Sequence, residues 1–144
     1  VQRQLDLRLL DPELAKVLDL EQVRPFFASG VWQRIAVARQ VLREEPFITA
    51  LPAGEVVPEA AGQGRAAKAP VLVQGIADLV LVFPDHLELL DYKTDRRKTE
   101  ADFLSAYRPQ LNLYALAIDK RFAPKKVTYK GIYSLELGKL IEVK

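Results

Sequence analysis

The sequence predicts an α/β fold in which helices flank both faces of a mixed central sheet. Helical periodicity with capping residues comes first, two strand-like runs follow at 71–83 and 87–94, and a helix and a hairpin close the chain. The run 71–83 carries apolar residues on both faces, which is typical of a central strand covered on both sides. Strands with helices before and after them in the chain favour helical layers on each face of the sheet.

Several elements are predicted before residue 52. Asp11 is typical of a helix N-cap, and a second helix is expected over 20–28. A third helix is predicted over 30–42 with Ser29 as its cap. Alternation between flanking prolines predicts a strand over 43–51. The helical residues expected to face the core are Val23, Phe26 and Phe27, then Val31, Ile35, Ala38 and Leu42.

The second half of the chain begins with a segment rich in Gly, Ala, Pro and charge at 52–70, which we expect to be a long surface loop. After the two strands, Thr99 is predicted to cap a helix, with Asp102 at the capping-box position. Pro109 should kink or restart that helix. A hairpin is predicted around 137–139. The apolar face of the helix is expected to consist of Leu111, Ala115, Ile118 and Phe122.

Length and composition indicate one domain over residues 1–144. The absence of cysteine excludes disulfides, thiolate zinc sites and cysteine-ligated iron–sulfur clusters, so any metal must be held mainly by oxygen ligands. No apolar run approaches the roughly 20 residues that span a bilayer, and no secretory signal pattern is present, so we expect a cytoplasmic protein without membrane contact. Methionine is absent and the chain opens on Val1, so we expect a piece of a longer polypeptide.

The two strand-like runs each carry an aspartate. If they form an antiparallel hairpin turning at 84–85, Asp78 faces Asp91 and Ile76 faces Lys93. Since side chains alternate along a strand, all four should share one face of the hairpin. The apolar residues on the same face are Val80, Val82, Leu87 and Leu89.

Two carboxylates directly opposed on a strand pair, with Cβ atoms about 4.5 to 5.5 Å apart, repel each other. A positive charge should therefore lie between Asp78 and Asp91. Lys93 is one candidate, and a divalent cation is the other, because Mg²⁺ prefers one or two carboxylates with waters. The alternative interpretation is that both aspartates point to solvent at the ends of their strands, with Lys93 as an ordinary surface partner.

Three short motifs follow one another at separations that together are more specific than any one alone. They are G-x-x-D, D-Y-K and Q-x-x-x-Y, carried by Gly75 and Asp78, by Asp91, Tyr92 and Lys93, and by Gln110 and Tyr114. In these motifs the chain resembles the RecB-type nuclease domains of the PD-(D/E)XK superfamily, which have a restriction-endonuclease-like core. The upstream stretches FFASGVWQRI and REEPF resemble the AddA group of these domains in particular.

The resemblance implies a Mg²⁺ site, with Mn²⁺ as a possible substitute, formed by Asp78, Asp91 and the backbone carbonyl of Tyr92. Lys93 would orient or deprotonate the attacking water and offset phosphate charge. Gln110 and Tyr114 lie one helical turn apart and would reach the same site. The resemblance also suggests DNA-phosphate contacts by the basic residues that follow the second strand, Arg96, Arg97 and Lys98.

By resemblance, the function is DNA exonuclease activity in an AddA-type helicase-nuclease that processes double-strand breaks for recombination. Its DNA would be single-stranded near duplex ends, and its partner would be an AddB-type subunit. ATP would serve only a helicase domain of the parent protein, since no G-x-x-x-x-G-K-[ST] loop occurs here. The alternatives are a non-catalytic DNA-binding or scaffold module, and a CRISPR-associated RecB-like exonuclease. The latter usually carries cluster cysteines, which this chain lacks.

One feature departs from the family pattern. RecB-type nucleases carry a metal-binding histidine in an upstream helix, and here no histidine precedes His86. At roughly 3.3 Å per residue His86 lies about 16 Å along the strand from Asp91, so we expect a turn residue and not a ligand. Glu44 in REEPF matches a glutamate of the family, and a structural pairing with an arginine is as consistent with the sequence as a role in chemistry.

Overall fold

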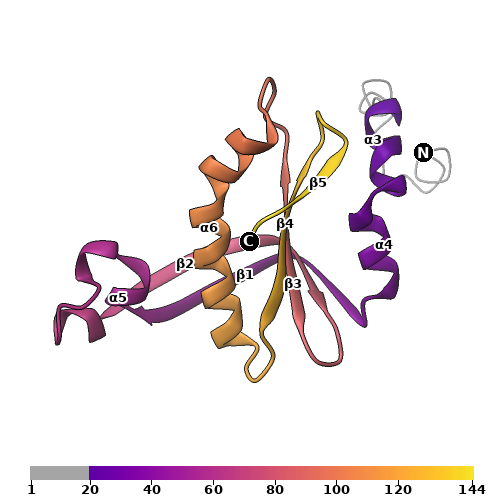
Figure 1. The fold of residues 1–144 in the computed structure, drawn as a ribbon. Coiled ribbons are helices and arrows are strands. Elements are labelled where there is room, and N and C mark those ends of the chain that lie inside the picture. Colours follow the sequence, from indigo (N-terminus) through magenta and orange to yellow (C-terminus); the bar gives the residue numbers. More distant parts are fainter. Residues whose placement is uncertain (1–19) are drawn as a thin grey trace, which may run out of the picture.

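The computed structural model of the chain describes residues 20–144, shown as a ribbon in Figure 1. The helix predicted to start at Asp11 lies outside the described residues. A five-stranded sheet forms the centre, and its strands are adjacent in the order β1-β2-β3-β4-β5. The elements in chain order are α3 (Leu20–Ala28), α4 (Gly30–Val37), β1 (Gln40–Pro52), α5 (Ala53–Val56), η1 (Pro58–Ala60), η2 (Ala66–Lys68), β2 (Pro70–Val82), β3 (Leu87–Lys93), α6 (Glu100–Arg121), β4 (Val127–Ser134) and β5 (Lys139–Glu142).

The sheet is mixed, as the sequence predicts. Strands β3 and β4 are parallel and are joined by the crossover helix α6, while the other neighbouring strands are antiparallel. Helix α6 lies on one side of the sheet, and α3 and α4 lie on the other (Figure 1). Both faces of the central strands are therefore covered, which explains why β2 and β3 read as nearly continuous apolar runs.

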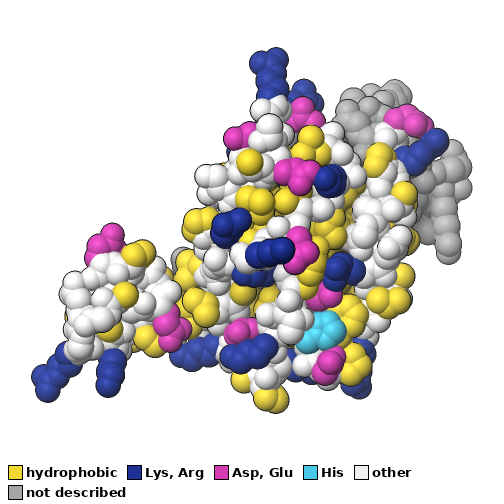
Figure 2. All heavy atoms as spheres, viewed as in Figure 1, with side chains coloured by type: hydrophobic (Ala, Val, Ile, Leu, Met, Phe, Trp, Pro, Cys, Tyr) yellow, Lys and Arg dark blue, Asp and Glu magenta, His cyan; other side chains and the backbone are white. Residues whose placement is uncertain are grey.

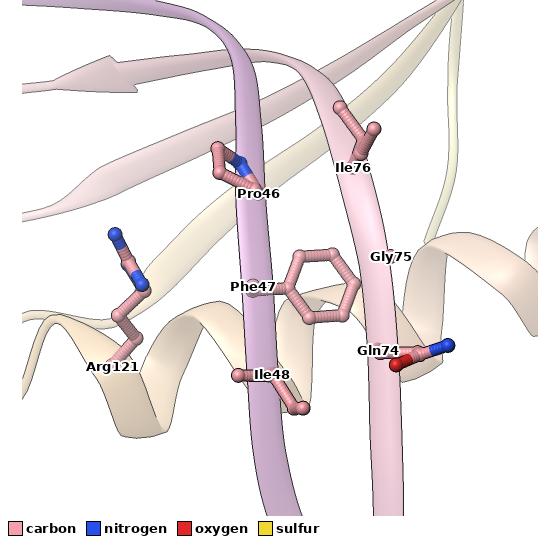
Figure 3. Close-up of a pocket in the computed structure, with 7 residues that line it drawn as sticks. All are labelled: Pro46, Phe47, Ile48, Gln74, Gly75, Ile76 and Arg121. Atoms are coloured by element: carbon pink, nitrogen blue, oxygen red, sulfur yellow. The ribbon is translucent and has the colours of Figure 1, made fainter.

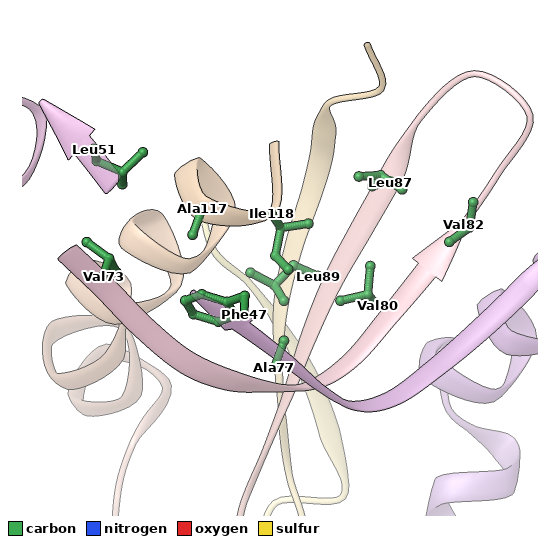
Figure 4. Close-up of a cluster of buried hydrophobic side chains, with 10 residues drawn as sticks. All are labelled: Phe47, Leu51, Val73, Ala77, Val80, Val82, Leu87, Leu89, Ala117 and Ile118. Carbon is green, nitrogen blue, oxygen red and sulfur yellow. The ribbon is translucent and has the colours of Figure 1, made fainter. Parts of the chain in front are cut away.

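Each face of the sheet has its own apolar cluster. On the α6 side, Ala117 and Ile118 pack over residues of β1, β2 and β3 (Figure 4). On the other side, Val31 of α4 packs against Leu79 and Leu81 of β2. Alternating residues of one strand thus serve both clusters. The buried members of the α6-side cluster are Phe47, Leu51, Val73, Ala77, Val80, Val82, Leu87, Leu89, Ala117 and Ile118.

Strands β1 and β2 form a long ribbon that extends beyond the rest of the sheet (Figure 1). Each has 13 residues, whereas β3 has 7, and their pairing continues to Pro52 and Pro70. The prediction of an irregular loop over 52–70 is wrong in part, because this segment holds α5, η1 and η2 at the tip of the ribbon. The short helical turns give buried or turn-forming backbone groups local hydrogen-bond partners.

Two predictions for the first helices are wrong. Helix α4 ends at Val37, because Ala38 is extended with ψ 141° and the Arg39 N–H donates to the Val82 carbonyl at 2.9 Å. Leu42 consequently lies in β1, where it pairs with Val80. Phe27, expected to face inward, is 54% exposed, because α3 directs Phe26 and not its neighbour against the sheet.

Helix α6 has the predicted start. The Thr99 hydroxyl accepts from the Asp102 N–H and the Asp102 carboxylate accepts from the Thr99 N–H, so the capping box is complete. The helix continues through Pro109 without restarting. The predicted closing hairpin is formed by β4 and β5, with Gly138 at φ 58° in the turn. Among residues 20–144, none of the helices has the length and apolar character needed to cross a bilayer.

Candidate active site at the end of the β2–β3 hairpin

The register of β2 and β3 places Asp78 next to Asp91. The four backbone pairs of this ladder run from Val82–Leu87 to Leu79–Leu90, which is the register predicted from the sequence. The two aspartates follow immediately beyond the last pair. There the Tyr92 N–H donates to Oδ2 of Asp78 at 2.9 Å, so a side chain continues the ladder in place of a backbone carbonyl.

The predicted pairing of Ile76 with Lys93 is wrong. Ile76 instead pairs with Pro46 of β1 and is 57% exposed. The ladder ends before this point because Asp78 uses its carboxylate to satisfy the backbone of β3, and β2 continues only with β1 as the projecting ribbon. Lys93 remains near the carboxylates because it follows Asp91 by two residues on the same face of β3.

Lys93 provides the positive charge that the carboxylate pair requires. Its ammonium forms an ion pair with Oδ2 of Asp91, and both side chains are largely buried, with 17% and 8% exposure. Burial raises the pKa of the Asp91 carboxyl above its ordinary value. Lys93 acts in the opposite direction, and the neighbouring Asp78 carboxylate raises this pKa further. The solvent-facing interpretation of Asp91 is therefore wrong: its charge is buried and compensated within the site.

The donor set suits a hard cation held by few protein ligands. Within residues 20–144, no cluster of three or more His, Cys, Asp or Glu side chains is arranged to hold a metal ion. Two neighbouring carboxylates are nevertheless a set that Mg²⁺ accepts, since it keeps several waters. Burial and the Asp78 charge both disfavour the ionised form of Asp91, and a divalent cation would relieve both effects. Asp78 and Asp91, with the Tyr92 carbonyl beside them, thus fit Mg²⁺ better than zinc, which prefers nitrogen and sulfur.

The structure places Gln110 and Tyr114 against the ribbon. The Gln110 side-chain amide donates to the Tyr114 hydroxyl at 3.4 Å, and the Tyr114 ring meets that of Phe47 with centroids 4.8 Å apart. The Tyr114 hydroxyl and the Phe47 ring also lie close to Gly75, three residues before Asp78 (Figure 3 shows Gly75 and Phe47 side by side). No described contact joins Gln110 or Tyr114 to Asp78, Asp91 or Lys93 in this part of the chain, 20–144.

Gly75 is required by this close packing. A Cβ atom at this position would lie 2.7 Å from Cζ of Phe47 and 2.9 Å from the Tyr114 hydroxyl. We expect Gly75→Ala to lower the free energy of unfolding by about 1 to 3 kcal/mol through overpacking. Urea unfolding would measure the change, with Gly30→Ala as the control because its Cβ would meet only Leu140 at 3.4 Å. Equal midpoints for the two variants would contradict the packing argument.

The basic residues after β3 differ from one another. Arg96 and Arg97 are exposed, and the Arg97 backbone, at φ 59°, donates its N–H to Glu136 at 2.7 Å. Lys98 is only half-buried, and its ammonium pairs with Asp95 at 2.6 Å. Of the three, Arg96 and Arg97 are therefore better placed than Lys98 to contact a phosphate.

The sequence reasoning missed Asp95 and Tyr107. The Tyr107 hydroxyl donates to both oxygens of Asp95, at 2.8 and 2.9 Å, and Nζ of Lys93 lies 4.5 Å from the centroid of the Tyr107 ring. A signal was present, because Tyr107 precedes Gln110 by one helical turn on α6. Which aromatic residue of the helix would meet Lys93 depends on how α6 docks, and that cannot be deduced from the spacing.

His86 and Glu44 have the positions that the register predicts. His86 is a turn residue: it stacks on Phe83 with centroids 4.4 Å apart and contacts the exposed Asp85 at 2.7 Å. Glu44 lies at the register position opposite Asp78, between the Arg43–Leu79 and Glu45–Ala77 pairs, with φ 50°. The ion pair with an arginine falls on its neighbour Glu45, which binds Arg121 at 2.6 Å.

Comparison with known proteins agrees with this geometry. The family model described as "PD-(D/E)XK nuclease superfamily" matches residues 3–141. The chain belongs to the PD-(D/E)XK nuclease superfamily. The mixed five-stranded sheet with helices on both faces is accordingly the restriction-endonuclease-like fold that the motifs predict.

Relatives of this PD-(D/E)XK chain are described as the AddA subunit of an ATP-dependent helicase/nuclease. That of Ligilactobacillus salivarius is 37% identical over 135 residues, covering 93% of this chain and 10% of the relative. That of Carboxydothermus hydrogenoformans is 36% identical over 137 residues, with 94% and 11% covered. That of Desulforudis audaxviator is 42% identical over 107 residues, with 73% and 8% covered. The chain thus spans about a tenth of the length of the curated relatives it matches.

Proposed function

We propose that the chain is a single nuclease domain, residues 1–144, of an AddA-type helicase-nuclease, and that it hydrolyses DNA phosphodiester bonds with Mg²⁺ or Mn²⁺. The observation that carries this proposal is the buried Asp91 carboxylate next to Asp78, with Lys93 as its counter-charge, at the end of the β2–β3 hairpin. Membership in a nuclease superfamily supports the same chemistry.

Asp78, Asp91 and the Tyr92 carbonyl hold the cation in this proposal. Bound Mg²⁺ supplies polarisation of a phosphate oxygen and an activated water. Lys93 orients that water or takes its proton, and its ammonium offsets the charge that develops on the phosphate. The ion pair with Asp91 keeps the ammonium within reach of this position.

Binding of the DNA strand falls to side chains around the carboxylates. Gln110 and Tyr114 project from α6 toward the ribbon and are proposed to contact substrate beside the site. Arg96, Arg97 and, more weakly, Lys98 are proposed to contact backbone phosphates, which gives affinity without reading bases. Figure 2 shows Lys and Arg side chains interspersed with carboxylates over the face that carries α6, a mixed surface suited to such unspecific contacts.

The wider role rests on the relatives' description as components of a helicase/nuclease. In it, the domain degrades single-stranded DNA near duplex ends during double-strand break repair and recombination in the cytoplasm. An AddB-type subunit is the proposed partner, and ATP is used by the helicase part of the parent protein.

Cleavage of labelled single-stranded DNA by the chain tests the proposal. Cleavage is expected with Mg²⁺ or Mn²⁺, should stop when EDTA removes the metal, and should return when Mg²⁺ is added in excess. Cleavage that persists at full rate in EDTA would contradict a metal-dependent mechanism.

The second candidate function is a DNA-binding or scaffold module without chemistry. It is favoured by the limited donor set, since residues 20–144 offer the site two carboxylates and no histidine near them. It predicts that single-stranded DNA binds equally well in EDTA and Mg²⁺ and is never cut. Product formation that requires Mg²⁺ would eliminate it.

A further inference from the structure

Tyr107 contacts the ammonium group of the candidate active site from a different element. Nζ of Lys93 lies 4.5 Å from the centroid of the Tyr107 ring, a separation at which a cation and an aromatic face attract each other. Lys93 is on β3 and Tyr107 is on α6, so the contact joins the sheet to the crossover helix. Lys93 is therefore held from two sides, by the Asp91 carboxylate and by this ring.

The Tyr107 ring is itself fixed at both ends. Its inner part packs beside Phe103, one helical turn earlier and fully buried, with ring centroids 6.2 Å apart. Its hydroxyl donates to both oxygens of Asp95, and Lys98 pairs with the same carboxylate at 2.6 Å. The partners Lys98 and Tyr107 hold the pKa of Asp95 below its ordinary value, so this acceptor is charged at neutral pH.

A fixed ring matters because a lysine side chain is flexible. Four carbons and their rotatable bonds separate the ammonium from the backbone, and ordering them has an entropic cost. In the proposed reaction the Asp91 oxygen that Lys93 contacts must also serve a cation, which weakens the hold of Asp91 on the ammonium. The face of Tyr107 then remains as an attractive surface that carries no negative charge and does not compete for the metal.

We propose that Tyr107 is a positioning residue that holds the Lys93 ammonium beside the Asp78–Asp91 pair, with Asp95 and Lys98 fixing the tyrosine ring. The consequence for cleavage rests on the proposed function, whereas the contact itself does not. A merely structural Tyr107 would fill space between α6 and the sheet, and any apolar side chain of similar size would replace it. A positioning Tyr107 requires an aromatic face at this point.

The first readout is the NMR spectrum of the Lys93 side chain in the metal-free protein. Its Hε protons should show an upfield ring-current shift and nuclear Overhauser contacts with the Tyr107 ring. Assignment follows from the signals lost in Lys93→Gln. The shift should remain in Tyr107→Phe, which keeps the ring, and disappear in Tyr107→Leu, which keeps an apolar side chain only. Tyr129→Leu is the matched control, because Tyr129 stacks under Arg34 at 3.6 Å, away from Lys93.

The second readout is cleavage of single-stranded DNA. In Tyr107→Leu the value of kcat should fall about two- to thirty-fold while KM is unchanged, as expected when a cation–π contact is lost. Tyr107→Phe should restore most of the rate. An unchanged Lys93 shift in Tyr107→Leu, or absence of the Overhauser contacts in the unaltered protein if that variant does not fold, would overturn the inference. So would a lost shift with unaltered kcat. A protein that never cleaves DNA would defeat the proposed function, and the Lys93 signals would still decide whether Tyr107 holds the ammonium.

Discussion

Asp91→Asn is expected to reduce the rate of Mg²⁺-dependent DNA cleavage by about 10³-fold. The substitution keeps the shape of the side chain and removes the charge that would bind the cation. Metal stabilisation of the phosphate in the transition state amounts to several kcal/mol, and each 1.36 kcal/mol corresponds to about tenfold in rate. Initial rates with single-stranded DNA at saturating Mg²⁺ measure the effect.

The matched control for this prediction is Asp85→Asn. Asp85 lies in the β2–β3 turn, at the other end of the hairpin, and its side chain is 85% exposed. Its replacement removes the same charge from the same hairpin and should leave the rate unchanged. Comparable rates for Asp91→Asn and the unaltered chain would remove Asp91 from the site.

Arg34→Ala is expected to lower the free energy of unfolding by about 3 kcal/mol, the lower end of the range for breaking a buried pair. Nη1 of Arg34 binds Oε1 of Glu88 at 2.5 Å, and the Glu88 side chain is only 8% exposed. Arg34 itself is 33% exposed, so part of the interaction is screened by water. Without Arg34 the buried carboxylate loses its counter-charge and α4 loses a polar link to β3. Urea unfolding measures the effect.

Two comparisons separate this cause from a general loss of packing. Arg24→Ala removes an exposed partner of Glu21, with 77% and 73% side-chain exposure, and should change stability by less than about 0.5 kcal/mol. The double variant Arg34→Met with Glu88→Leu should recover most of the loss, because apolar residues of similar size often replace a buried ion pair well. If Arg34→Ala is no less stable than Arg24→Ala, the buried pair does not anchor α4.

The fold was predictable where local patterns determine it. Alternation and the turn at 84–85 were sufficient for the β2–β3 register, because a slip of one residue would have moved Val80 and Leu89 out of the core. Periodicity alone could not locate the end of α4. Val31, Ile35 and Ala38 do pack in one cluster, but Leu42 continues the same spacing from a strand and packs in the other cluster.

The candidate site divides in the same way. Asp78, Asp91 and Lys93 come from adjacent strands, so their proximity follows from a period of two and a short turn. Tyr107 comes from a helix, and its contact with Lys93 depends on the docking of α6, which the Thr99 capping box and buried Phe103 determine together. Lys98, predicted to face DNA, was assigned from charge alone, and its pairing with Asp95 depends on that tertiary arrangement.

Titration of isotope-labelled protein with Mn²⁺ tests most directly whether β2 and β3 together bind one divalent cation. Paramagnetic broadening should affect the backbone signals of Asp78, Asp91 and Tyr92 first, and the double variant Asp78→Asn with Asp91→Asn should abolish it. Broadening centred elsewhere, or unchanged in the double variant, would contradict the metal site on which the proposed nuclease chemistry rests.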